Sequence, residues 1–321
     1  MAADSRAGQV CCVRFNTAMR HKIRLLPTLT ADGARQMALD EVLLEQAERG
    51  FASCRIYFWD RPTLSLGYFQ SAAEREAWPE LSHLPVVRRM TGGGAIVHGS
   101  QWPMPLGGLT PADPLPHSPY LTDWTYALAL PARLVAGRPA SCWHDEIHQA
   151  LCGVLRRFGI DAHVLPRAGH CQSGPQVTVV ARAPLLIDEY PKSASLKRWE
   201  EPEASLVGSP TTASDRVAPD GPGQGARARE FLCFDRPAPG DVVRHGRKIV
   251  GSAQRLRRGA LLQHGSILLP RGLCDVTAWA QLWLAELGWD VEPVNWSPEE
   301  LAQAERWASE RYRQDHWNFR R

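Results

Sequence analysis

The order of strand and helix patterns constrains the fold of this chain more than any other feature of its sequence. Residues 54–59, 63–69, 84–89 and 260–269 are rich in β-forming residues and indicate short strands. The apolar spacing over residues 143–158 instead predicts a helix. Because strands and helices do not alternate regularly, as they would in βαβ units, the sequence predicts an α+β fold with mixed or antiparallel sheets and flanking helices.

A helix is expected in the N-terminal part of the chain, and it should end at Gly50. Asp32 is a suitable N-cap, and apolar residues from Leu39 to Ala47 form one broad face of the helix. Asp40 lies inside that apolar face. We therefore expect its carboxylate to be buried and hydrogen-bonded.

Turn and loop patterns divide the rest of the chain. A turn at Arg61 and Pro62 predicts that the strands on either side of it pair as a hairpin. Residues 99–122 are rich in Pro and Gly and are expected to form a loop insertion. Residues 192–229 contain few large apolar side chains, which predicts a disordered insertion.

Composition narrows the classes of function. No apolar run in the 321 residues approaches the ~20 needed to cross a bilayer, and no secretory signal is evident, so we expect no membrane segment and a cytoplasmic location. The net charge is only +3, and the Arg clusters at residues 88–89, 244–248 and 255–258 have no interleaved aromatic residues as in nucleic-acid-binding surfaces. The Arg clusters could face an acidic partner protein or form solvated surfaces.

Cys233 and Lys248 are the strongest candidates for chemistry. Only four of the 37 basic side chains are lysines, so a lysine in this Arg-rich background is a candidate for a role that Arg cannot perform. Lys248 follows Cys233 by fifteen residues. A thiolate is a nucleophile and a nearby ammonium favours it, so the two would form an acyl-transfer site if they met across adjacent strands.

The small residues Gly251, Ser252 and Ala253 follow Lys248. They would let a carbonyl substrate approach backbone donors, which commonly stabilise a tetrahedral oxyanion. Tight packing of a strand would select the same small residues. They are candidates for substrate binding.

Two other patterns are weaker. His144 and His148 are one helical turn apart, a spacing that can bind zinc, but the order differs from H-E-x-x-H and we expect histidines beside solvent. The cysteines also lack paired C-x-x-C motifs, so no metal site is predicted. The run Gly92 to Gly94 lacks the frame of a Walker phosphate loop.

Six stretches along the chain carry recognisable motifs, namely Gln36 to Glu41, Pro62 to Gln70, Arg88 to His98, Gly246 to Arg255, Leu262 to Ser266 and Tyr312 to Asn318. Together they resemble one family, lipoate-protein ligase A and the related octanoyltransferases of the LipM type. They occur in the family's order and cover most of residues 22–135 and 230–320. The resemblance implies a single catalytic domain over residues 22–321, of the type shared with biotin protein ligases.

The resemblance also implies roles for individual residues. Cys233 looks like the nucleophile of the transferases, at a position where ligases typically have Asn-Asp, and Lys248 looks like the family's active-site lysine. The implied reaction passes an octanoyl group from acyl carrier protein, through a thioester on Cys233, to a lysine of a lipoyl domain. That domain would belong to a glycine cleavage H protein or an E2 subunit, and no cofactor would be required. The other residues that the matched motifs assign to substrate binding are Arg89, Gly92, Gly93, Gly94, His98 and His264.

Three other functions are compatible with the same motifs and stay open. An ATP- and magnesium-dependent lipoate ligase is favoured by Gly94, where LipM-type proteins often have Arg, and is opposed by Cys233. An amidotransferase that moves octanoyl between lipoyl-domain proteins would also use a cysteine. A non-catalytic protein of the same fold that binds an acyl group or a lipoyl domain is opposed by the presence of both Cys233 and Lys248.

Overall fold

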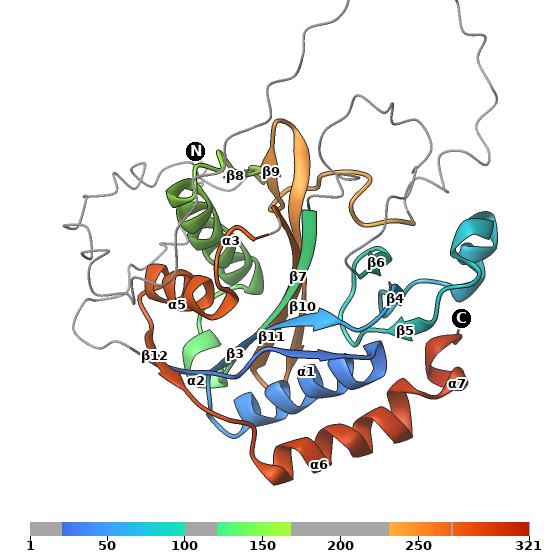
Figure 1. Cartoon of the computed structure of the whole chain (residues 1–321). Helices are drawn as coiled ribbons and strands as arrows, with labels where there is room; N and C mark the ends of the chain where they lie inside the picture. The colour runs from blue at the N-terminus through green and yellow to red at the C-terminus, as the bar shows by residue number, and fades with distance from the viewer. Residues whose placement is uncertain (1–20, 100–120, 168–230, 271, 321) are drawn as a thin grey trace, which may run out of the picture.

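The computed structural model describes residues 21–99, 121–167, 231–270 and 272–320. These residues form a large mixed sheet, a small three-stranded sheet and helices around them (Figure 1). The large sheet has the order β12-β1-β3-β7-β11-β10-β9-β8, with β2 added beside β3, and the small sheet has the order β5-β4-β6. The strands are β1 (Lys22–Leu25), β2 (Leu29–Ala31), β3 (Ser53–Trp59), β4 (Thr63–Leu66), β5 (Val86–Arg88), β6 (Ile96–His98), β7 (Leu121–Leu130), β8 (His163–Val164), β9 (Val242–Arg244), β10 (Arg247–Arg257), β11 (Ala260–Pro270) and β12 (Asp290–Pro293).

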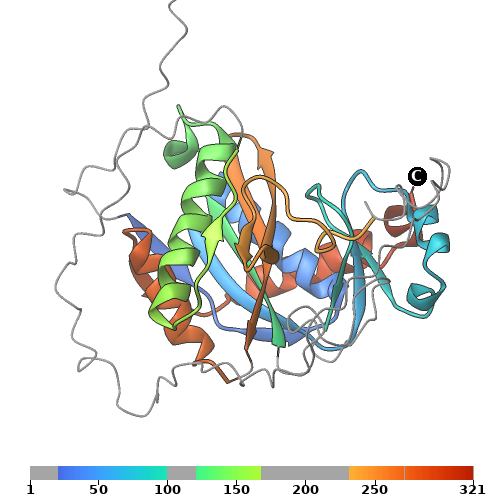
Figure 2. The ribbon, with the colours of Figure 1, turned by 90° about the horizontal axis from the view of Figure 1, so that it is seen from above.

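Helices cover both faces of the large sheet, α3 and α5 on one face and α1 and α6 on the other (Figures 1 and 2). Strand β7 shows why the sheet has two apolar faces. Its side chains Trp124, Tyr126 and Leu128 join the core beneath α3 and α5, whereas Ala127 and Ala129 join the core beneath α1. The predicted α+β class is confirmed. The helices are α1 (Gly33–Glu48), α2 (Ala132–Val135), α3 (Ala140–Arg157), α5 (Val276–Glu286), α6 (Pro298–Trp307) and α7 (Asp315–Asn318), with 3-10 turns η1 (Ala72–Ala77) and η2 (Pro79–Leu81) and a π turn η4 (Ala308–Tyr312).

Helix α1 begins and packs as its sequence predicts. The Asp32 carboxylate caps it by accepting a hydrogen bond from the backbone N–H of Arg35 at 2.8 Å. Asp40 is fully buried, and its carboxylate accepts hydrogen bonds from Arg55 at 2.6 Å and from the Tyr57 hydroxyl at 3.0 Å. The expectation of a buried, hydrogen-bonded Asp40 is confirmed.

The predicted hairpin of the strands around Arg61 and Pro62 is wrong. Strand β3 pairs with β7 in the large sheet, whereas β4 pairs with β5 and β6 in the small sheet. The turn between them therefore passes the chain from one sheet to the other. Both strands satisfy their backbone groups through partners that are distant in sequence, which a local pattern does not contain.

The two predicted insertions lie almost entirely outside the described residues. Residues 192–229 belong to a stretch that the structure does not describe, and of residues 99–122 only Gly99 and the start of β7 at Leu121 are described. The single domain over residues 22–321 therefore stays a prediction. Among the helices that the structure describes, none combines the length and apolar character needed to cross a membrane.

Candidate active site

The backbone that carries Cys233 lies between the two sheets and belongs to neither. A parallel bridge joins Leu232 to Ala95, beside β6, with Ala95 N donating to Phe231 O at 2.7 Å and Cys233 N donating to Ala95 O at 2.8 Å. Lys248 is at the start of β10. The expectation that Cys233 and Lys248 meet across adjacent strands is therefore wrong in its geometry. They meet across a loop that is hydrogen-bonded to Ala95, directly after Gly92, Gly93 and Gly94. We call these three residues, which precede β6, the glycine turn.

The side chains of Cys233 and Lys248 are in contact. Lys248 Nζ lies 3.2 Å from Cys233 Sγ and donates to the Cys233 carbonyl at 3.0 Å and to Asp241 Oδ2 at 2.8 Å. Burial lowers the pKa of Lys248, but the negative charges of Cys233 and Asp241 outweigh burial, and the net shift of this pKa is upward. The amine is therefore held as an ammonium beside the sulfur.

Asp241 is a member of this cluster that sequence reasoning missed. Its side chain is buried, and Oδ2 also accepts a hydrogen bond from the backbone N–H of Ala238 at 2.7 Å, which fixes the carboxylate. In the sequence, an isolated Asp that follows Pro and Gly is typical of a solvated loop. The signal that could have found it is its place seven residues before Lys248, on the segment that leads into the turn at His245 and Gly246.

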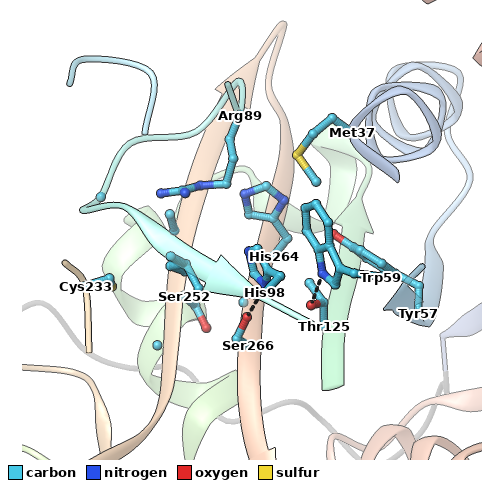
Figure 3. A pocket seen from close by; sticks show the side chains of 15 residues that line it. Met37, Tyr57, Trp59, Arg89, His98, Thr125, Cys233, Ser252, His264 and Ser266 are labelled. Atoms are coloured by element: carbon cyan, nitrogen blue, oxygen red, sulfur yellow. Dashed lines mark hydrogen bonds between the residues drawn. The ribbon is translucent and has the colours of Figure 1, made fainter. Parts of the chain in front are cut away.

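A pocket of about 370 Å³, counting the part open to solvent, runs from Cys233 between the two sheets to Trp59 (Figure 3). Seven of the substrate-binding candidates named from the sequence line it, namely Arg89, Gly93, His98, Gly251, Ser252, Ala253 and His264. Gly92 and Gly94 flank Gly93 but do not line the pocket. The lining residues that the sequence did not single out are Met37, Tyr57, Trp59, Ile96, Thr125, Gly265 and Ser266.

The lack of a side chain at Gly251 and Gly94 leaves room for the Lys248 side chain and for the backbone of Cys233. A Cβ at Gly251 would lie 2.4 Å from Lys248 Cε and 3.6 Å from Cys233 Sγ. A Cβ at Gly94 would lie 3.1 Å from Cys233 N and 3.2 Å from Cys233 Cα. Close approach of the reactive side chains and of the Cys233 backbone therefore accounts for glycine at both positions.

Arg89 lines the pocket but directs its donors into the protein. Its Nη1 donates to the carbonyl and the hydroxyl of Ser65, and its Nη2 donates to the carbonyls of Gly92 and Gly94 at 3.0 and 2.9 Å. Burial lowers the pKa of Arg89 to about 10, so the guanidinium stays charged at neutral pH. Through these hydrogen bonds Arg89 fixes the conformation of the glycine turn.

His98 lies in the pocket wall in a fixed orientation. Its Nδ1 is 2.8 Å from Asp123 Oδ2, its Nε2 is 2.9 Å from Ser65 Oγ, and its ring stacks on Trp59 with centroids 4.0 Å apart. Burial lowers the pKa of His98 and outweighs the opposing effect of Asp123. A neutral ring donates from Nδ1 to the carboxylate and accepts from Ser65 at Nε2.

His264, on β11, is fixed in the same manner. Its Nδ1 is 2.8 Å from Asp40 Oδ2 and its Nε2 is 2.5 Å from Thr91 Oγ1. Through these contacts it connects the buried carboxylate of α1 to the glycine turn. Both ring nitrogens have protein partners.

The two histidines of α3 are buried, so the expectation that they lie beside solvent is wrong. His148 Nδ1 lies 2.6 Å from the Gly240 carbonyl, and its Nε2 lies 2.6 Å from Ser252 Oγ. Burial and the nearby His144 hold the pKa of His148 well below 6.5, so the ring is neutral and Nε2 accepts the Ser252 proton. The Ser252 hydroxyl is therefore already engaged, with Tyr126 as its other partner at 2.6 Å. Across the part of the chain that the structure describes, no cluster of three or more His, Cys, Asp or Glu side chains could hold a metal ion.

Burial favours the protonated thiol at three other cysteines, Cys54, Cys152 and Cys274. Cys54 and Cys152 are buried, and burial raises the pKa of Cys152 to about 11. Burial likewise raises the pKa of Cys274 to about 12. Neither Cys152 nor Cys274 has an ammonium group in contact with its sulfur, as Cys233 does.

Two family models match this chain. The lipoyl protein ligase A/B catalytic domain matches residues 32–102, and the biotin/lipoate A/B protein ligase family matches residues 215–270. These matches include every pocket-lining residue except Thr125, and both Cys233 and Lys248. Both segments therefore match the biotin and lipoate protein ligases.

Within this family the chain is LipM-like. It is 29% identical over 252 residues to octanoyltransferase LipM of Kyrpidia tusciae, an alignment that covers 77% of this chain and 65% of that protein. It is 25% identical over 342 residues to octanoyltransferase LipM of Halalkalibacterium halodurans, covering 93% and 99% of the two chains. The chain thus spans slightly less than two thirds of the first of these relatives.

Solved structures show the same fold. A bipartite lipoate protein ligase from Thermoplasma acidophilum, solved in a study of that ligase and its E2 lipoyl domain, superposes with a TM-score of 0.54 at 16% identity, over 94% of this chain and 97% of that one. A lipoate-protein ligase A bound with ATP gives a TM-score of 0.52 at 16% identity, over 94% and 99%. At this identity the likeness concerns the fold, and it agrees with the predicted lipoate ligase-like architecture.

Proposed function

We propose that this chain is an octanoyltransferase of lipoate biosynthesis that works through a thioester on Cys233. The donor is octanoyl-acyl carrier protein, and the acceptor is a lysine of a lipoyl domain in a glycine cleavage H protein or an E2 subunit. The observation that carries this proposal is the 3.2 Å contact of Cys233 Sγ with Lys248 Nζ at one end of the pocket that extends to Trp59. The names of the LipM relatives agree with it.

In the first half of the reaction, the Cys233 thiolate attacks the thioester carbonyl of the donor. The amide of Cys233 donates to Ala95, so the charge that develops on the carbonyl oxygen is stabilised by the Lys248 ammonium. The bond to the donor sulfur breaks as the new thioester forms, and Lys248 gives a proton to the leaving thiolate. Asp241 holds Lys248 in place throughout.

In the second half, the neutral amine of the acceptor lysine attacks the thioester on Cys233. The amide forms, the Cys233 sulfur leaves as a thiolate, and the proton released from the acceptor nitrogen passes to the neutral Lys248 amine. The cycle ends with the same thiolate and ammonium with which it began. One lysine thus serves as acid in the first half and as base in the second.

This cycle needs no cofactor, and we propose that none is used. Activation of free lipoate would instead require ATP and magnesium and would leave Cys233 without a role. Transfer of octanoyl between lipoyl-domain proteins would use the same thioester and differ only in its donor. We place the reaction in the cytoplasm, following the sequence argument.

Intact-mass spectrometry after mixing with octanoyl-acyl carrier protein, without ATP, tests the proposal. We expect one octanoyl adduct on the native chain, removed by hydroxylamine, and none on Cys233→Ala. Cys142→Ala, which removes another partly exposed cysteine, is the matched control and should acquire the adduct at the native rate. Adding a lipoyl domain should then move the octanoyl group onto its lysine.

The alternatives give different products in the same assay. An adduct obtained only from an octanoylated lipoyl-domain protein would make the chain an amidotransferase. Formation of lipoyl-adenylate from ATP and free lipoate, with no adduct from the carrier protein, would make it a ligase. An adduct that persisted in Cys233→Ala would overturn the assignment of the nucleophile.

A further inference from the structure

The buried His148 of α3 contacts both segments that carry the Asp241–Lys248 ion pair. Its Nδ1 lies 2.6 Å from the carbonyl of Gly240, the residue before Asp241. Its Nε2 lies 2.6 Å from the hydroxyl of Ser252, four residues after Lys248. The side chain is fully buried, and no step of the proposed reaction uses it. One ring therefore connects the loop of the carboxylate to the strand of the ammonium.

The backbone of β10 is irregular at Lys248. Lys248 and Gly251 are three residues apart, so in a regular strand their side chains would point to opposite faces. A register shift between Lys248 and Val250 instead turns the ammonium to the face of Gly251, where Cys233 lies. Pairing with β11 begins only at Val250, so at Lys248 the strand pairs with β9 alone. Contacts outside the sheet ladder must therefore help to fix the ammonium.

The Ser252 hydroxyl provides such a contact from the opposite face of β10. Adjacent residues of a strand point to opposite faces, so this hydroxyl faces α3, whereas the Cβ position of Gly251 faces the reactive pair. The hydroxyl donates to His148 and accepts from the Tyr126 hydroxyl at 2.6 Å, which in turn accepts from Gln263 at 2.9 Å. All these donors point in one direction, and they end on the unprotonated Nε2 of a neutral ring.

The groups around His148 keep its ring neutral and in place. His144, one turn earlier on α3, lies with its ring centroid 4.2 Å away and contacts Arg167, which is paired with Asp145. Burial, and then the positive charges of His144, Lys248 and Arg167, lower the pKa of His148, and the hydrogen bond to the backbone carbonyl opposes them. The ring is therefore held as a donor at Nδ1 and an acceptor at Nε2.

We propose that His148 is a positioning residue that holds Asp241 and Lys248 beside Cys233. The ring does not line the pocket, so it acts on the reactive pair through the Gly240 carbonyl and through β10. Loss of its two hydrogen bonds would let the loop and the strand shift relative to each other. The consequence for catalysis rests on the proposed function, whereas the consequence for the Cys233 thiol does not.

Three substitutions separate positioning from a general loss of stability. His148→Phe keeps a ring and removes both hydrogen bonds, whereas His148→Asn places an amide N–H near the position of Nδ1 and can keep the donor to Gly240. Leu155→Ala, which truncates a buried side chain two turns further along α3, is the destabilised control. All three should unfold at a lower temperature than the native chain, but only His148→Phe should change the reactivity of Cys233.

The first measurement is the rate at which iodoacetamide alkylates Cys233 as a function of pH, followed by peptide mass spectrometry. The thiolate is the reactive form, and an ammonium in contact favours it. In His148→Phe we expect the midpoint of this profile to rise by about one pH unit, with the other two variants near the native value. An unchanged midpoint in His148→Phe, or an equal rise in Leu155→Ala, would overturn the proposal. If His148→Phe does not fold, Ser252→Ala should give a smaller rise, and no rise would overturn it equally.

The second measurement is octanoylation by octanoyl-acyl carrier protein. We expect kcat to fall about tenfold in His148→Phe with little change in KM, because the ring touches no substrate, and to recover in His148→Asn. A higher KM with an unchanged kcat would contradict a role in positioning the reactive pair. If the native chain is not acylated at all, the proposed function fails, while the alkylation profiles still decide the role of His148.

Discussion

Gly251 lies against the ends of both reactive side chains. The atoms that a Cβ at this position would meet are Lys248 Cε at 2.4 Å and Nζ at 2.8 Å, which form the flexible end of a side chain. A methyl group can therefore be accommodated by moving the ammonium, without moving the strand. The fold and the reactivity of Cys233 should respond differently to this substitution.

We expect Gly251→Ala to slow octanoylation of Cys233 by about 100-fold, because displacement of a catalytic group by about 1 Å has an effect of that order. The thermal unfolding temperature should change little. Gly153→Ala is the control, since its Cβ would meet the flexible end of Glu286 on α5, far from the pocket. Native acylation kinetics in Gly251→Ala would show that the position of the ammonium is unimportant.

Residues of the site differ in how far the sequence reveals them. The motifs around Cys233 and Lys248 made the two residues candidates for a reactive pair without showing that they meet, and the structure brings them into contact. The roles of Asp241 and His148 depend on how the loop before β9 packs against α3, and nothing in the sequence near either residue encodes that packing. Their catalytic or positioning roles stay proposals.

Helix α1 is joined to the large sheet by a buried ion pair. Asp40 and the Arg55 side chain of β3 are 0% and 1% exposed, and their nearest charged atoms are 2.6 Å apart. Although burial disfavours the carboxylate, Arg55 and His264 hold the pKa of Asp40 below its ordinary value. Removal of the carboxylate would leave the Arg55 cation buried beside the core.

We expect Asp40→Ala to lower the free energy of unfolding by about 3–5 kcal/mol, the usual result of leaving one member of a buried pair without its partner. Denaturant unfolding followed by circular dichroism measures it. Asp60→Ala, which removes the partner of the exposed Arg61, should have a much smaller effect. Equal effects of the two substitutions would contradict this account of α1.

Local signals in the sequence predicted the start of a helix correctly, whereas the pairing of strands that are distant in sequence was not predicted. The cap at Asp32 located the start of α1. The pairing of β3 was mispredicted because its neighbours β1, β2 and β7 come from other parts of the chain. Periodicity identifies a strand but does not specify which strand lies beside it.

At the scale of the whole molecule, buried histidines link stability to pH. Burial lowers the pKa of His98, His144 and His148 below the value of 6.5 that each regains on unfolding. Below pH 6.5 the unfolded chain therefore binds more protons than the folded chain, and the free energy of unfolding must fall as pH decreases.

We expect the free energy of unfolding to be lower at pH 5.5 than at pH 7.5, by up to about 1.4 kcal/mol per pH unit for each histidine that stays neutral in the fold. Denaturant titrations at the two pH values measure the difference. His148→Gln, which can keep a donor toward Gly240, should reduce the pH dependence, whereas the exposed His163→Gln should not. The same dependence in all three proteins would assign it to other groups.

The pairing of β10 with β11 also has a consequence for the acyl groups that Cys233 can accept. Eight consecutive residues of β10 are paired with β11, so Gly251 and Ala253 cannot move along the strand relative to one another. The strand therefore fixes the distance between the reactive pair beside Gly251 and the pocket wall at Ala253. A stronger apolar contact cannot move the carbonyl of a chain of the wrong length onto Cys233, and selection among acyl groups should follow chain length before affinity.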